Sequence, residues 1–192
     1  MFTIEQISSA LALHKRRQYA ENEFPGFAKA AVLIPIFPTA EGLSVLFTVR
    51  TNEVETHKGQ ISFPGGMNDP SDADAVQTAL RETEEEIGIM KNEVQVIGTL
   101  DDHPVPSRFI ITPVVGFLKK RPHYTPNPKE VAEVFDVPLR FFADENNGRT
   151  EKREFSGKTV IVWHFQTGNH LIWGATAAMV RNLIDVVSGQ LR

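Results

Sequence analysis

The chain has 192 residues with 41% hydrophobic and 23% charged side chains, the composition of an ordinary globular protein with a full core. Its net charge of −4 argues against a nucleic-acid backbone as the main partner, because such binding draws on clustered Lys and Arg. With no cysteine, disulfides, thiolate metal sites and a Cys nucleophile are excluded. We expect one domain over residues 1–192, cytoplasmic and without a membrane span, because no uncharged apolar segment reaches about 18 residues.

Residues 3–19 have the apolar periodicity of a helix and end before the turn-rich stretch 22–26, so an N-terminal helix is predicted there. The segment includes the basic cluster His14-Lys15-Arg16-Arg17. We interpret this cluster as the solvated face of that helix, which is the usual role of a short charged run.

Strands mixed with helices favour an α+β fold, an α/β/α sandwich in which helices cover both faces of a mixed sheet. Two apolar strands at 30–37 and 43–50 enclose the loop 38–42, which favours an antiparallel hairpin. Pro113 lies in a later strand and indicates a sheet edge or a bulge, since proline cannot donate to a neighbouring strand. Residues 59–63 lead into a glycine turn. The further predicted elements are a helix at 72–87, strands near 94–101, 109–118, 131–139, 153–156 and 159–166, and a last helix at 174–187.

An acidic motif lies at the end of the first long helix, where residues 81–89 read Arg-Glu-Thr-Glu-Glu-Glu-Ile-Gly-Ile. At about 100° per residue, Glu82, Glu85 and Glu86 point to one side of this helix, whereas Glu84 faces away. Like charges three and four residues apart repel each other, so such a face favours a compensating cation. Hard carboxylate oxygens suit Mg²⁺ or Mn²⁺.

Two glycines, Gly65 and Gly66, precede this helix, and Gly88 follows it as a helix stop. Together these features resemble the Nudix box, here over residues 66–89. The pattern of that family is Gly, five residues, Glu, seven residues, then Arg-Glu-apolar-any-Glu-Glu-any-Gly-apolar. The second half matches closely, but in the first half Asp72 replaces the Glu and the loop after it is one residue longer.

We interpret Asp72 as part of a helix start, because it departs from the Glu that the family has at this position. Ser71 followed by Asp74 three positions later is the spacing of a capping box at the N-terminus of a helix.

The resemblance implies a mixed-sheet sandwich fold and a metal-dependent pyrophosphatase, which cuts a nucleoside diphosphate joined to another moiety by water attack on phosphorus. Carried over by position, Glu85 and Glu86 bind the metal, and Glu82 is a further ligand or orients the water. Gly65 offers its backbone carbonyl to the metal, and Arg81 holds a glutamate by a charge-assisted bond.

The catalytic base is the least determined role, because the family often draws it from a loop outside the box. Glu130 is our candidate and Glu133 is the second, both near the predicted strand at 131–139. Glu82 also remains open for this role.

Stretches outside the box resemble the coenzyme A pyrophosphatase branch of the family, and the resemblance runs over roughly residues 30–187. The strongest support for this branch is the sequence His-any-Gly-Gln that precedes the two glycines. The stretches are Leu46-Phe47-Thr48-Val49-Arg50-Thr51, His57-Lys58-Gly59-Gln60-Ile61-Ser62-Phe63-Pro64-Gly65-Gly66, Ile111-Thr112-Pro113-Val114-Val115-Gly116 and Ile172-Trp173-Gly174-Ala175-Thr176-Ala177.

This branch implies cleavage of coenzyme A or acyl-CoA to 3′,5′-ADP and 4′-phosphopantetheine or its acyl form. The 3′-phosphate of coenzyme A calls for cations, and Arg50, Lys58 and Arg108 are the candidates. The chain departs from the branch at Glu55, where the branch has an Arg. The alternatives are another nucleoside diphosphate derivative, such as a nucleotide sugar or ADP-ribose, and a catalytically silent Nudix-fold binding module. Family analogy also leads us to expect a homodimer.

Overall fold

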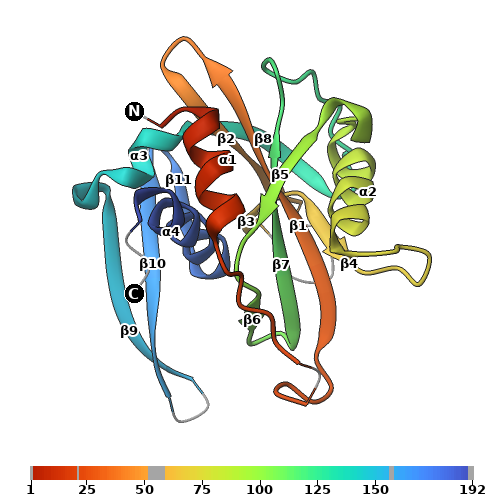
Figure 1. The fold of residues 1–192 in the computed structure, drawn as a ribbon, viewed down its shortest axis with the longest axis vertical. Helices are drawn as coiled ribbons and strands as arrows, with labels where there is room; N and C mark the ends of the chain where they lie inside the picture. Colours follow the sequence, from red (N-terminus) through yellow and green to blue (C-terminus); the bar gives the residue numbers. More distant parts are fainter. Residues whose placement is uncertain (1, 21, 52–58, 156–157, 190–192) are drawn as a thin grey trace.

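The computed structural model describes residues 2–20, 22–51, 59–155 and 158–189, and a large mixed sheet forms the centre of this part (Figure 1). Eight described strands make the sheet, in the order β3-β2-β1-β7-β5, with β4 paired to β1, β6 to β7 and β8 to β2. Only β1 and β7 pair in parallel among these described strands. The strands are β1 Ala28–Thr39, β2 Gly42–Arg50, β3 Ile61–Ser62, β4 Gly65–Met67, β5 Gln95–Thr99, β6 His103–Val105, β7 Phe109–Phe117 and β8 Val131–Pro138.

A smaller antiparallel sheet, in the order β11-β10-β9, follows in the C-terminal part of the described chain. Its strands are β9 Gly148–Phe155, β10 Lys158–Thr167 and β11 His170–Trp173. The helices are α1 Ile4–Leu13, α2 Ala75–Ile87, α3 Leu139–Ala143 and α4 Gly174–Ser188, with short 3₁₀ turns η1 Lys91–Glu93 and η2 Glu145–Asn147. Within the described ranges, no helix has the length and apolar character needed to cross a membrane.

Strand β1 is buried on both faces, which explains why its sequence is a continuous apolar run rather than an alternating one. Ala31 and Leu33 point toward α2, where they pack with Ala79. Val32 and Ile34 point the other way, into the core that α1 and α4 help to form. Figure 1 shows α2 on one side of the sheet and α1 with α4 on the other. Helices therefore cover both faces, and the predicted α+β class is confirmed.

The N-terminal helix ends earlier than its periodicity indicates. It begins after Thr3, whose hydroxyl accepts the Gln6 N–H while the Gln6 side chain accepts the Thr3 N–H. Ile7 and Leu11 are its buried residues, whereas Leu13 is 84% exposed. Because the apolar contact with the core stops at Leu11, the chain leaves the helix after Leu13, and the predicted end at residue 19 is wrong.

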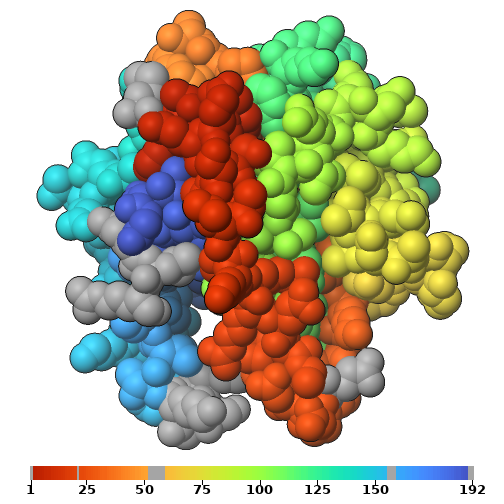
Figure 2. Space-filling model, in the orientation of Figure 1, coloured from red at the N-terminus to blue at the C-terminus, as the bar shows by residue number. Residues whose placement is uncertain are grey.

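The basic cluster consequently lies beyond the helix, in an extended segment of residues 14–20 that we call the strap. Its interpretation as a helix face is wrong. His14 is largely buried and its ring nitrogen lies 2.9 Å from Asp101. Arg16 pairs with Asp102 and donates to the Thr112 hydroxyl at 2.9 Å. In Figure 2 the strap continues α1 as a red ridge across the front of the molecule.

Pro113 does not lie at a sheet edge, because β7 pairs with β1 on one side and with β5 and β6 on the other. The proline faces the interruption between β5 and β6, where β5 pairs only with residues 114–117 and β6 only with 109–111. The missing N–H of proline is therefore accommodated by a break in the neighbouring strand rather than by an edge.

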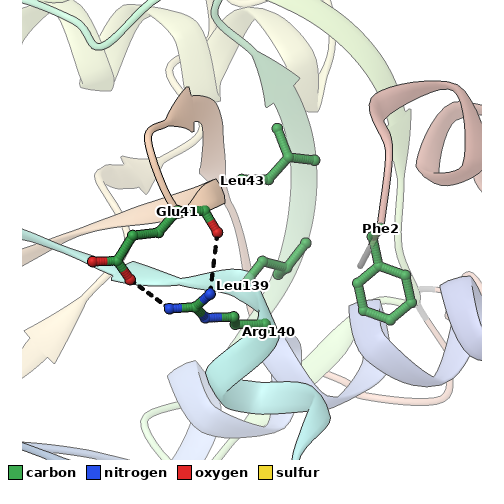
Figure 3. Close-up of a pocket in the computed structure, with 5 residues that line it drawn as sticks. All are labelled: Phe2, Glu41, Leu43, Leu139 and Arg140. Carbon is green, nitrogen blue, oxygen red and sulfur yellow. Dashed lines mark hydrogen bonds and ion pairs between the residues drawn. The ribbon is translucent and has the colours of Figure 1, made fainter.

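The tip of the β1–β2 hairpin is fixed to α3 by an ion pair. The Arg140 guanidinium donates to the Glu41 carboxylate at 2.6 Å and to its backbone oxygen at 3.5 Å (Figure 3). The cavity beneath this pair, which Phe2, Leu43 and Leu139 also line, holds only about 10 Å³. Such a volume suits a single water at most, so this contact is structural.

Candidate active site

The helix that carries the acidic motif begins at Ala75, with Asp74 as its N-cap. The Asp74 carboxylate accepts the Gln77 N–H at 2.9 Å. Ser71 instead donates to Asp69 through both its hydroxyl and its N–H, so the predicted Ser71–Asp74 capping box is wrong. At the other end Gly88 adopts the left-handed conformation with φ 72°, which confirms it as the helix stop.

Thr83 occupies the position where the box has an apolar residue. Its side chain is buried, and its hydroxyl donates to the Ala79 backbone oxygen at 2.6 Å. Because this local bond satisfies the hydroxyl, threonine fits the apolar face of α2 without an unpaired polar group.

The two glycines before the helix are required by close contacts. A Cβ on Gly66 would lie 2.4–2.6 Å from the carboxylate atoms of Glu82, so this carboxylate lies directly on the Gly66 backbone. Gly65 has φ +154°, and a Cβ there would meet the Ala31 oxygen at 2.4 Å. The Gly65 N–H donates to Glu86 at 3.2 Å. The glycine turn and the acidic helix therefore form one tightly fitted unit.

Arg81 connects this unit to the preceding loop. Its guanidinium makes a two-pronged contact with Asp72, at 3.1 and 2.9 Å, and donates to the Met67 oxygen at 3.1 Å. The remaining nitrogen donates to Glu82 at 2.8 Å and to Glu85 at 3.2 Å, which confirms that Arg81 holds a glutamate.

Asp72 is therefore the anchor of Arg81, and the prediction that it caps the helix is wrong. Its side chain is only 5% exposed. Hydrogen bonding from Arg81 holds the pKa of this carboxyl well below its usual range, with the Asp69 N–H and the Thr78 hydroxyl also donating to it. The spacing of Asp72 from the glycines was the sequence signal for this role. The longer loop between Asp72 and Arg81 made that signal hard to recognise.

Glu86 is the most deeply buried of the box carboxylates, with 4% of its side chain exposed. Its partners are the Gly65 N–H and the Arg50 guanidinium, 3.5 Å away. Burial raises the pKa of Glu86 to about 7, and the nearby charges of Glu130 and Glu82 add to the rise.

Burial likewise raises the pKa of Glu82, against the lowering effect of its bond from Arg81, and Glu85 and Glu130 oppose its charge further. The acidic face is thus short of compensating positive charge. This shortage is what a bound divalent cation would relieve.

The donor set fits a hard cation, because Glu82, Glu85 and Glu86 offer carboxylate oxygens from one helix face. Their present rotamers do not form a ligand cage: across the described residues, no three His, Asp or Glu side chains converge closely enough to hold a metal. Glu82 and Glu85 turn to Arg81, and Glu86 turns to Gly65. Metal binding by this set therefore requires Glu82 and Glu85 to exchange the arginine for the cation.

The loop before β8 brings Glu130 to the acidic face, a connection that sequence reasoning missed. The Asn127 N–H donates to the Glu86 backbone oxygen at 2.8 Å, and the Thr125 N–H donates to Ile87 in the same way. The Asn127 amide then donates to the Glu130 carboxylate at 3.0 Å. The loop thus uses the free carbonyl groups at the end of α2 as its attachment points.

The other predicted residues lie at different places. Glu133 forms an ion pair with His170 of the second sheet at 3.1 Å rather than facing the box. Arg50 lies at the end of β2 beside Glu86, within the site. Arg108 is in the exposed turn before β7 with φ 63°, and no described contact joins it to the acids. Lys58 lies outside the described residues.

Comparison with known proteins identifies this arrangement. The model of the NUDIX domain matches residues 27–160. The chain is 38% identical over 159 residues to "Nudix hydrolase 15, mitochondrial" of Arabidopsis thaliana, covering 79% of this chain and 56% of that protein. It is 37% identical over 157 residues to "Peroxisomal coenzyme A diphosphatase NUDT7" of Mus musculus, covering 79% and 66%.

The chain thus spans about three-fifths of the length of these two relatives. Among solved structures, the fold matches the MutT protein of Methanosarcina mazei with a TM-score of 0.52 at 15% identity, covering 86% of this chain and 96% of that one. The chain belongs to the Nudix hydrolase family, as its acidic box predicted.

Proposed function

We propose that the chain is a metal-dependent pyrophosphohydrolase that cleaves the diphosphate of coenzyme A or acyl-CoA. The products are 3′,5′-ADP and 4′-phosphopantetheine or its acyl form. The observation that supports hydrolysis most directly is the fit of the Glu82 and Glu86 carboxylates onto the glycine turn. The identity to a protein named coenzyme A diphosphatase supports the substrate.

Glu82, Glu85 and Glu86 would hold Mg²⁺ or Mn²⁺, which when bound neutralises diphosphate charge and lowers the pKa of a bound water. Arg81 positions Glu82 and Glu85, because one of its nitrogens contacts both while the other two stay on Asp72. The Gly65 backbone carbonyl remains the further metal ligand that we propose.

Arg50 and Glu130 complete the proposed chemistry. Arg50 lies beside Glu86 with its side chain partly exposed, so its guanidinium would bind a phosphate oxygen of the substrate. Glu130 is our proposed base for the attacking water, because its charge acts on both Glu82 and Glu86. Lys58 and Arg108 remain proposed contacts for the 3′-phosphate.

A coupled phosphatase assay tests this function. Phosphate release is measured with Mg²⁺ or Mn²⁺ on coenzyme A, ADP-ribose, a nucleoside diphosphate sugar and dinucleoside polyphosphates. We expect coenzyme A to be preferred and Glu86→Gln to lose at least about a hundredfold in rate. Glu84→Gln is the matched control, since it makes the same charge change on the same helix and should retain activity.

The alternatives correspond to distinct results of this assay. Preference for ADP-ribose or a nucleotide sugar, still abolished by Glu86→Gln, would retain the reaction and reject the substrate. No turnover of any compound would favour a silent binding module. The intact Arg81, Glu82, Glu85 and Glu86 support the enzyme. We also propose that the protein is a cytoplasmic homodimer. Sedimentation equilibrium would measure the mass of the assembly in solution.

A further inference from the structure

A second cavity lies away from the acids, lined by the strap, the loop that follows it, and the first residues of β1 and β7. Figure 1 shows the strap and this loop, red to orange, leading into β1. The cavity holds about 340 Å³, within the range of small-molecule binding sites. The residues that line it are Tyr19, Phe24, Gly26, Phe27, Lys29 and Ile110. None of these was predicted as a site residue from the sequence.

The cavity wall combines aromatic rings with positive charge. The rings of Tyr19 and Phe24 meet edge to face with their centroids 5.0 Å apart, and the ring centroids of Phe24 and Phe27 are 5.1 Å apart. The Arg17 guanidinium lies 4.5 Å above the Tyr19 ring, and Lys29 lines the cavity. Aromatic faces bind a planar ring by stacking, and cations bind phosphate. This lining therefore suits a nucleobase that carries a phosphate.

Hydrogen bonds hold the strap side of the wall in place. The Arg17 N–H donates to Asp101 at 2.8 Å, and the Asp102 N–H donates to the Arg17 oxygen at 2.9 Å. The Tyr19 N–H donates to the Asp102 carboxylate at 3.3 Å. Tyr19 is thus positioned before any ligand arrives, which lowers the entropy cost of binding.

The cavity lies on the same face of the sheet as the acidic box. Ala31 pairs with Gly66, and the Glu82 carboxylate lies on Gly66 from the α2 side. Lys29 is two residues before Ala31, so its side chain points to that same side. Two residues along a strand span about 7 Å. Lys29 therefore stands about 7 Å along β1 from the position that Glu82 covers.

We propose that this aromatic cavity binds the nucleotide end of the substrate, with the base against Phe24 and its neighbours and a phosphate against Lys29. The diphosphate of the same substrate would then lie toward Glu82, so that one ligand spans the cavity and the acidic face. This inference rests on the proposed function for the identity of the nucleotide, which would be the adenosine 3′-phosphate of coenzyme A.

Calorimetric titration of the full chain in EDTA tests the cavity separately from the acids. The probes are 3′,5′-ADP, adenosine and 4′-phosphopantetheine. We expect Phe24→Ala to weaken 3′,5′-ADP binding about tenfold, the effect of one lost base stack. Lys29→Gln should weaken 3′,5′-ADP but not adenosine. Trp173→Ala removes an exposed aromatic of the second sheet and should change neither, and thermal melts confirm that each variant is folded.

Turnover gives the second readout. Phe24→Ala should raise the KM for coenzyme A about tenfold at unchanged kcat, because the contact is the same in the ground and transition states. Equal 3′,5′-ADP binding by the wild type and Phe24→Ala, no binding at all, or preference for 4′-phosphopantetheine would each overturn the proposal. If Phe24-dependent nucleotide binding persists while coenzyme A is not hydrolysed, the cavity assignment stands and the proposed substrate fails.

Discussion

Replacing Glu86 by Gln should change how the stability of the metal-free protein depends on pH. Burial raises the pKa of Glu86 from its ordinary 4.5 to about 7. The folded state therefore binds more protons at this residue than the unfolded state between those two values. Stability from Glu86 is accordingly highest below pH 4.5, falls as the pH rises through this window, and is constant above it.

The size of the effect follows from the two pKa values. The difference between about 7 and 4.5 corresponds to about 3 kcal/mol, most of which falls between pH 5 and pH 8. Urea unfolding in EDTA at both pH values measures this loss. We expect the free energy of unfolding of the wild type to fall by about 2 to 3 kcal/mol more than that of Glu86→Gln, because Gln carries no proton equilibrium.

Glu84→Gln is again the matched control and should keep the wild-type dependence. Saturating Mg²⁺ should remove much of the loss in the wild type, since a cation stabilises the charged carboxylate. Identical pH dependence in the wild type and Glu86→Gln would refute the reasoning. It would mean that Glu86 is either well solvated or fully compensated by Arg50 in the folded protein.

Three further variants test the packing and charge arrangement of the site. Gly66→Ala should lose at least about a hundredfold in kcat, measured by phosphate release, because its Cβ displaces the Glu82 carboxylate. Glu130→Gln should lose about 10²-fold or more in kcat, whereas Glu133→Gln should lose less than about threefold; equal losses would reject Glu130 as the base. Arg81→Lys should lower both kcat and the melting temperature, because an ammonium cannot replace the two-pronged contact of the guanidinium.

Elements with a strong periodic or apolar pattern were predictable from the sequence. The β1–β2 hairpin, α2 and α4 all lie close to their predicted ranges. The end of α1 was not predictable, because residues 14–18 contain no glycine or proline that would stop a helix. The helix ends there because no core remains beyond Leu11 for it to cover. The short strands β3, β4 and β11 were missed as separate elements, since a few residues carry no measurable alternation and their pairing depends on distant partners.

The acidic face of the site was predictable from helical geometry, whereas its supporting contacts were not. Glu82 and Glu86 do lie over the glycine turn, because their spacing on α2 alone decides their direction. Asn127 carries no local signal for its bonds to Glu86 and Glu130, since these depend on how a loop meets the end of a helix. Glu133, close to Glu130 in sequence, instead pairs with a residue of the second sheet.

The aspartate by which this box departs from the family pattern holds Arg81 in place. Both oxygens of Asp72 contact Arg81, at 2.9 and 3.1 Å. Asp72 fixes two of the guanidinium nitrogens, which leaves the third for Glu82 and Glu85. Glu82 and Glu85 can therefore leave the arginine for a cation while Arg81 itself stays in place.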